Sequence, residues 1–280
     1  MVNEYRELTY KGAVVFNKLN VDAPKRELKP FKDNEACFMF VNEGVFNVRT
    51  PDQLFHFNIG EGMLAKCFNF FIETDKFQQK DNPKLEFIGV FIFPEIVEEL
   101  LQSDALKSNH VVDYNLKQIH IDKLLVNFKQ SIEVLLENPE LASEDMIEAK
   151  LKEFILLISK TQGVSQRDFL SAIFQLNNID FKTIIKANLY TNLTVPEFAL
   201  LCSMSVSTFK RKFAEIFNDS PKQYLLKMKL ARATELLAFG TLRVAEIAYE
   251  CGFDTLSTFN RSFKASYRKS PSAYRLSYSA

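Results

Sequence analysis

The sequence of 280 residues contains no tryptophan, and it has only three histidines, four cysteines and eight glycines. None of the cysteines belongs to a Cys-x-x-Cys pair, so the usual spacing of a zinc site is missing. Four thiols in a chain of this length are typical of a reducing compartment. The sequence therefore predicts a protein without structural zinc that resides in a reducing compartment.

Long apolar runs are also absent. No stretch of 18 apolar residues occurs, so we expect no membrane span and no membrane partner. The first 16 residues lack the pattern of basic residues followed by apolar ones that a secretion signal requires. We therefore expect a cytoplasmic protein.

The chain as a whole carries no net charge, because 35 basic residues balance 35 acidic ones. The balance does not hold locally. Residues 1–180 carry a net charge of −8, whereas residues 181–280 carry a net charge of +8. A basic region joined to an acidic body suggests a nucleic-acid partner, so this asymmetry favours DNA or RNA binding by residues 181–280.

The apolar segments in the first third of the chain are short and lie between turn-forming residues. Gly-, Pro- and Asn-containing turns recur every 8–12 residues, a spacing typical of a β-sandwich or barrel. We therefore predict a β-rich regulatory domain over residues 1–105. Its expected strands lie within 37–41, 45–48, 54–59, 63–72 and 85–93.

After this region the apolar residues recur every three or four positions, which indicates amphipathic helices. The pattern predicts one helix over about 121–138, a second over about 143–162 and a shorter one over 169–176. These helices form a predicted helical subdomain over 106–178. The two long helices could form a homodimer seam through residues 115–160, or they could pack on the barrel or on each other.

The most informative feature is an internal repeat of roughly 50 residues. Residues 193–224 match residues 242–274 in order, with Arg211 opposite Arg261 and a Ser-Pro-x-x-Tyr ending in both copies. Each copy is expected to fold as a helix, a tight turn and a second helix. A basic, all-helical domain over 179–280 is therefore predicted.

The helix starts of the two copies differ. Thr194 and Glu197 have the spacing of a capping box, in which a hydroxyl and a carboxylate each bond a free backbone N–H. In the second copy Arg243 replaces the threonine, so only Glu246 remains of this box. Asp254, in the second turn, is placed to cap the helix that follows.

The second helix of each copy has two distinct faces. Aromatic residues recur every four positions on one face, which predicts that this face is core. The opposite face carries side chains that suit the DNA major groove, since Arg contacts guanine and Asn contacts adenine. An exposed charged face is often only solvated, but here it occurs twice. The core residues are Phe209, Phe213, Phe217, Phe259, Phe263 and Tyr267. The residues expected to face bases are Ser207, Lys210, Arg211, Ser257, Asn260 and Arg261.

Cations around these faces are expected to contact phosphates, which supplies affinity without base specificity. They are Lys212, Lys222, Lys227, Lys264, Arg268 and Lys269.

Residues 181–280 resemble the DNA-binding domain of the AraC/XylS family of bacterial transcription regulators. The resemblance is carried by the run from Ala245 to Phe253 and by the Phe, Arg and Ser-Pro positions after it. It implies two helix-turn-helix units joined by a long helix over 220–239, with both recognition helices in successive major grooves. Lys229 stands where the family usually has Arg. The resemblance implies the base readers Ser207, Lys210, Arg211, Ser257, Thr258, Asn260 and Arg261.

The N-terminal part is similar to the cupin-like effector domains of that family, through residues 41–44 and 57–62. The resemblance implies an α+β chain that pairs a cupin-like β-barrel and a helical dimerisation segment with the helix-turn-helix domain. It further implies activation of transcription with RNA polymerase, under the control of a small molecule. Control by a partner protein, or masking of the basic domain by the acidic part, remains an alternative.

An enzymatic barrel is the remote alternative. A catalytic or metal-binding cupin needs clustered histidines and a carboxylate, whereas His56, His110 and His120 each stand alone. No Gly-rich phosphate loop and no Gly-x-Ser-x-Gly elbow occur. We therefore expect no enzyme, no cofactor and no metal. His56 is interpreted as an ordinary strand residue, with contact to an effector as the other possibility.

Overall fold

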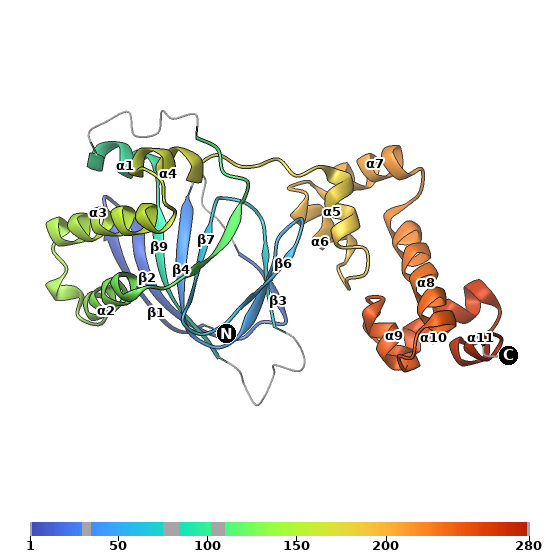
Figure 1. Cartoon of the computed structure of the whole chain (residues 1–280). Helices are drawn as coiled ribbons and strands as arrows, with labels where there is room; N and C mark the ends of the chain where they lie inside the picture. Colours follow the sequence, from blue (N-terminus) through green and yellow to red (C-terminus); the bar gives the residue numbers. More distant parts are fainter. Residues whose placement is uncertain (1, 30–34, 75–83, 102–109, 279–280) are drawn as a thin grey trace. The chain divides into compact units, whose positions relative to one another are not determined.

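The computed structural model describes residues 2–29, 35–74, 84–101 and 110–278 (Figure 1). They divide into two compact units. One unit takes residues 1–50 and 54–178, and the other takes residues 51–53 and 179–280. The first is built on β-sheets and the second on helices, so the chain has the α+β class that the sequence predicts.

Ten strands among the described residues form two antiparallel sheets in the first unit. The six-stranded sheet has the order β1-β2-β9-β4-β7-β10, and the four-stranded sheet has the order β3-β8-β5-β6. No strand pair joins the two sheets in the described part of the chain, so the predicted barrel is not closed. The strands are β1 Val2–Tyr10, β2 Ala13–Asp22, β3 Arg26–Leu28, β4 Ala36–Glu43, β5 Phe46–Arg49, β6 Leu54–Phe57, β7 Glu61–Ala65, β8 Phe71–Glu73, β9 Lys84–Ile92 and β10 Leu116–His120.

Strand β10 is a correction to the sequence-based expectation, which placed only helices between residues 106 and 178. Its residues pair antiparallel with β7, from Leu116 opposite Ala65 to His120 opposite Glu61. The partner strand lies about 50 residues earlier in the chain. Five residues with only two buried side chains, Leu116 and Ile119, give no clear local pattern. Tertiary pairing therefore decides this element.

Helices α2 and α3 lie along the outer face of the six-stranded sheet, and α1 and α4 lie at one end of it (Figure 1); all four share one apolar core with the sheet. Ring contacts join α2 and α3 to β4: the centroid of Phe38 on β4 lies 5.3 Å from that of Phe154, and that of Phe40 lies 6.3 Å from that of Phe128. The apolar stripes that could have formed a dimer seam are thus buried within their own unit. The helices are α1 Pro94–Leu101, α2 Lys123–Glu137, α3 Glu144–Thr161 and α4 Gln166–Ile173, with a 3-10 turn at Pro139–Leu141.

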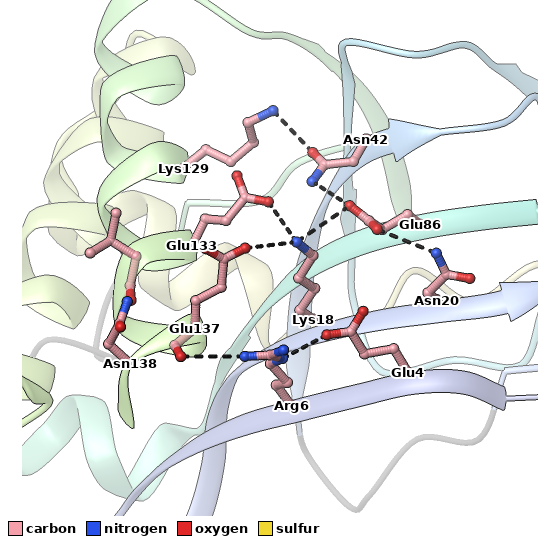
Figure 2. Close-up of polar contacts among 11 residues, drawn as sticks. Glu4, Arg6, Lys18, Asn20, Asn42, Glu86, Lys129, Glu133, Glu137 and Asn138 are labelled. Atoms are coloured by element: carbon pink, nitrogen blue, oxygen red, sulfur yellow. Dashed lines mark hydrogen bonds and ion pairs between the residues drawn. The ribbon is translucent and has the colours of Figure 1, made fainter. Parts of the chain in front are cut away.

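A polar cluster fixes α2 on the sheet at one end (Figure 2). The ammonium of Lys18 on β2 lies 2.8 Å from a carboxylate oxygen of Glu133, 3.3 Å from one of Glu137 and 3.7 Å from one of Glu86. Asn42 donates to Glu86 at 3.2 Å. Lys18 is only 9% exposed, so this multiple pairing offsets the cost of removing its charge from water.

The second core lies between the two sheets and is also built from phenylalanine. The ring centroid of Phe46 lies 5.4 Å from that of Phe57 and 5.1 Å from that of Phe87. All three side chains are buried. Burial of one such side chain contributes roughly 1.5–3 kcal/mol. The high phenylalanine content therefore serves packing on both faces of the large sheet.

The second unit is a series of helices with a polar residue at nearly every start. Ser205, Thr255, Ser220 and Ser270 each accept a hydrogen bond from a backbone N–H in the first turn of the helix that follows. The helices are α5 Phe181–Ala187, α6 Val195–Leu201, α7 Val206–Phe217, α8 Pro221–Phe239, α9 Val244–Glu250, α10 Leu256–Tyr267 and α11 Pro271–Leu276. This order confirms two helix-turn-helix units joined by one long helix.

Candidate nucleic-acid interface

The first helix-turn-helix unit consists of α6 and α7. The predicted capping box is present at its start: the Thr194 N–H donates to the Glu197 carboxylate at 2.6 Å, and the Glu197 N–H donates to the Thr194 hydroxyl at 3.4 Å. Ser203, with φ of 52°, turns the chain between the helices. The Ser205 hydroxyl then accepts from the Thr208 N–H at 3.2 Å and starts the recognition helix.

The second unit, α9 and α10, repeats this backbone path with different side chains. Glu246 alone caps α9, accepting from the Arg243 N–H at 2.6 Å, as predicted. Gly252, with φ of 75°, takes the turn position. Thr255, not the expected Asp254, caps α10, because its hydroxyl accepts from the Thr258 N–H at 3.2 Å. The hydroxyl lies one residue closer to the helix and has the reach for the first-turn amide.

The predicted core faces of both recognition helices are confirmed for their first two aromatic residues, whereas Phe217 and Tyr267 are only partly buried. Phe209 and Phe213 are fully buried on α7, and Phe259 and Phe263 are fully buried on α10. The ring centroid of Phe209 lies 5.7 Å from that of Phe213, and the corresponding distance from Phe259 to Phe263 is 5.6 Å. The two units therefore hold their recognition helices through the same aromatic pair, and the same helix face points outward in each.

The outward faces carry every residue expected to contact bases. All seven side chains are exposed, namely Ser207, Lys210, Arg211, Ser257, Thr258, Asn260 and Arg261. The hydroxyl of Ser207 lies 3.0 Å from that of the capping residue Ser205. Thr258 accepts from the Thr255 hydroxyl at 2.9 Å, so it takes part in the helix cap. The long polar groups of Lys210, Arg211, Asn260 and Arg261 are the ones that project from the helices.

The cations expected at phosphates fall into two groups. Lys222, Lys227, Lys264, Arg268 and Lys269 are exposed. Lys212 is different: it is only partly exposed, and its ammonium lies 5.1 Å from the centre of the Phe181 ring. That cation–π contact holds it against α5, away from the outward face that carries Lys210 and Arg211.

The start of α8 lies beside the first recognition helix. A hollow of about 450 Å³ is found there, lined by Val195, Lys210, Ala214, Ser220, Pro221 and Lys222. Its lining is mainly apolar. Pro221 has no N–H group, and the Gln223 N–H already donates to the Ser220 hydroxyl at 3.3 Å. The hollow is therefore assigned no anion.

The two cysteines of the repeat are packing residues. Burial raises the pKa of the Cys202 thiol to about 12 and that of Cys251 to about 11. Both thiols therefore stay protonated near neutral pH, and a thiol is a poor nucleophile and a poor metal ligand.

In the N-terminal, sheet-rich unit of the chain, His56 lies on β6 with its side chain exposed, while Phe57 on the same strand is buried between the sheets. The Nδ1 atom of His56 lies 2.5 Å from the side-chain oxygen of Asn47. A cavity of about 360 Å³ instead lies at residues of β2, β4, β9, β3 and β8. Its polar lining includes Asn17 and Lys29, and its apolar lining includes Phe87 and Phe91. Sequence reasoning missed this cavity because its walls come from strands that are far apart in the chain.

The described residues contain no group of three or more His, Cys, Asp or Glu side chains that could hold a metal ion. No helix in the same residues is long and apolar enough to cross a membrane.

Comparison with known proteins identifies both units. A helix-turn-helix domain family matches residues 198–277, and the ExsA N-terminal regulatory domain family matches residues 36–169. The virulence regulon transcriptional activator VirF of Yersinia enterocolitica is 24% identical over 196 residues, which cover 68% of this chain and 69% of VirF. The thermoregulatory protein LcrF of Yersinia pestis is 27% identical over 161 residues, 56% of this chain and 58% of LcrF. A crystal structure of ToxT from Vibrio cholerae with a bound unsaturated fatty acid shares 15% identity over 96% of this chain and 97% of ToxT, with a TM-score of 0.39.

Proposed function

The chain belongs to the AraC family of DNA-binding transcription regulators, and from this we propose that it activates transcription by laying α7 and α10 into two major grooves of promoter DNA. The observation that carries the proposal is the repeated outward face. Ser207 and Arg211 on α7, and Ser257 and Arg261 on α10, stand four residues apart above the same pair of buried phenylalanines.

The projecting side chains divide into two roles. Arg211 and Arg261 are the proposed guanine readers, and Asn260 is the proposed adenine reader, since these pairings are bidentate. Lys210, Ser207, Ser257 and Thr258 complete the base-reading set. Lys222, Lys227, Lys264, Arg268 and Lys269 are the proposed phosphate contacts. Lys212 belongs to the same proposed set, although its ammonium lies 5.1 Å from the centre of the Phe181 ring.

The test is footprinting and gel-shift titration of the full chain on duplexes that it selects from a random pool. We expect two protected half-sites and an affinity that falls steeply with salt, because phosphate binding releases counterions. Binding that does not discriminate between selected and unselected duplexes, at any salt concentration, contradicts the proposal.

We further propose that the N-terminal, sheet-rich unit is the sensor and that its cavity holds a small molecule. The volume of about 360 Å³ and the mainly apolar lining, with Asn17, Asp22, Glu27 and Lys29 as polar groups, support a small amphipathic ligand. Native mass spectrometry of purified protein tests this. Control by a partner protein is the second candidate, and it gains support if no small molecule is found and a Phe87→Ala change in the cavity leaves regulation intact.

The outer faces of α2 and α3 support a homodimer through residues 115–160. Their inner stripes are buried, yet Leu124, Val134, Met146 and Leu156 are each more than 40% exposed. Exposed apolar side chains on adjoining helices favour association. Analytical ultracentrifugation of a Val134→Glu, Leu156→Glu double variant checks the proposal, and an unchanged mass sinks it.

Action on promoter DNA requires RNA polymerase as a partner and a cytoplasmic location, and both are part of the proposal. Regulators of this kind need no catalytic group, and we assign none.

A further inference from the structure

The turn of the second helix-turn-helix unit contacts the long helix α8. The ammonium of Lys229 on α8 donates to the backbone carbonyl oxygen of Gly252 at 2.8 Å, and it lies 5.9 Å from the centre of the Phe253 ring. Lys229 is partly buried and makes no ion pair with any described residue. Its charge is thus held by one carbonyl dipole and one aromatic face, and the Asp254 carboxylate attracts it without an ion-pair contact. This arrangement depends on direction and distance.

The same turn also contacts the segment that precedes the first helix-turn-helix unit, α6 and α7. The side-chain amide of Asn192 donates to the Asp254 carboxylate at 2.9 Å. Gly252 approaches this segment so closely that a Cβ atom there would overlap the carbonyl oxygens of Tyr190 and Thr191. The second turn is therefore packed directly against the chain that leads into α6.

Together with α8, these contacts connect the two helix-turn-helix units at two places. Helix α8 leaves the end of α7 and carries α9 and α10, and its 19 residues span roughly 28 Å. If α8 were the single connection, the two helix-turn-helix units could bend and twist about it. The contacts of residues 190–192 with the second turn provide a second connection, and two connections hold two bodies far more rigidly than one.

We infer that Lys229 and the Asn192–Asp254 pair are positioning residues that set the distance and rotation between the two recognition helices, and so the spacing of the two half-sites that the protein accepts. The inference rests on the proposed function. None of these residues lies in the base-reading set. They act on specificity through the relative placement of α7 and α10.

The experiment uses the full chain and a duplex that the wild-type protein selects from a random pool, with its two half-sites mapped by footprinting. One or two base pairs are then added or removed between the half-sites. Each base pair shifts one half-site by about 3.4 Å and rotates it by about 35° around the duplex. Affinities are measured for the wild type and for Lys229→Met and Asn192→Ala.

For the wild type, we expect a change of one base pair to weaken binding about tenfold, comparable with the loss of one good base contact. In Lys229→Met and Asn192→Ala, we expect the same change to weaken binding only about threefold, since the second unit then adjusts its position at little cost. Lys229→Arg keeps a donor on the same helix and should restore the narrow spacing preference.

Glu235→Ala is the matched control, because Glu235 lies exposed on the same helix and pairs only with Arg232 among the described residues. It should keep the wild-type spacing profile. Thermal melts of every variant separate loss of folding from loss of positioning, and Asn192→Ala keeps the test open if Lys229→Met fails to fold.

Equal spacing profiles in the wild type and both variants overturn the inference, and so does a wild type that tolerates altered spacing without loss. If the wild type selects no duplex at all, the proposed function fails instead.

Discussion

The ammonium of Lys66 donates a hydrogen bond to the backbone carbonyl oxygen of Gln175 at 2.7 Å, although Lys66 is only 1% exposed. The bond joins the end of β7 to the residues that follow α4. Nearby, Asn177 and Asn115 exchange two further bonds, at 2.8 Å and 2.9 Å. The last residues of the first unit are therefore tied to its large sheet, just before the chain enters the DNA-binding unit.

This relationship predicts a pH dependence of stability. Burial lowers the pKa of Lys66 from 10.5 to about 8, although Asp113 opposes the shift. The unfolded chain thus binds more protons than the folded one between pH 8 and 10.5, and the Lys66 contribution to stability rises with pH in that window. Relative to Lys66→Met, the wild type should gain about 2 kcal/mol of unfolding free energy from pH 7 to pH 10.

Chemical denaturation of both proteins across this pH range measures the difference. Lys117→Met is the control: Lys117 is exposed and lies near the same Tyr114 ring, 5.2 Å from its centre. Its stability curve should run parallel to that of the wild type. A Lys66→Met curve that also runs parallel contradicts the prediction.

Arg211→Ala and Lys222→Ala should impair DNA binding in different ways. Arg211→Ala should cost about 1–3 kcal/mol and relax base preference at one position. Lys222→Ala should weaken all sequences alike and reduce the salt slope by about one counterion. Gel-shift titrations on matched and mismatched duplexes at several salt concentrations check both. Identical, sequence-independent losses would refute the division between base readers and phosphate contacts.

Gly252→Ala and Ser203→Ala should differ although both positions have positive φ, 75° and 52°. A methyl group at residue 252 would overlap the carbonyl oxygens of Tyr190 and Thr191, whereas residue 203 already carries a side chain. We expect Gly252→Ala to cost about 2 kcal/mol or more. Ser203→Ala should cost on the order of 1 kcal/mol or less. Similar melting temperatures for the two variants would show that the second turn is free to move away.

The two helix-turn-helix units should respond oppositely to substitutions at the N-cap of their first helix, α6 in one and α9 in the other. Arg243→Thr restores the missing hydroxyl beside Glu246 and should stabilise the second unit by about 1 kcal/mol. Thr194→Ala removes the equivalent cap and should destabilise the first unit by about the same amount. Calorimetry of the full chain checks both, and a stabilising Thr194→Ala would falsify the cap assignment.

Local patterns were sufficient for the helical unit. The four-residue spacing of Phe209 and Phe213, and of Phe259 and Phe263, identifies a buried face and an exposed one on each helix without any tertiary information. Caps such as Thr194–Glu197 and Ser220 follow from a few neighbouring residues. One local error, Asp254 in place of Thr255, arose because both side chains can cap and only the backbone path decides which one reaches the N–H.

The β-rich unit was less predictable, because sheets join distant residues. Strand β10 is set by its pairing with β7, and the open arrangement of two sheets depends on which strands remain at the edges. The buried stripes of α2 and α3 were equally compatible with a dimer seam and with the sheet. Only the rings of Phe38 and Phe40 on β4, far away in sequence, decide between them.

The sequence by itself determined that a basic C-terminal region holds two copies of one DNA-binding unit, since repeats, caps and helix periodicity are local properties of the chain. The tertiary structure alone decided how the copies are held together. Lys229 and Gly252 are 23 residues apart, and Asn192 and Asp254 are 62 apart. No spacing rule relates them, because their contact depends on the path of α8 and on the missing Cβ atom of Gly252.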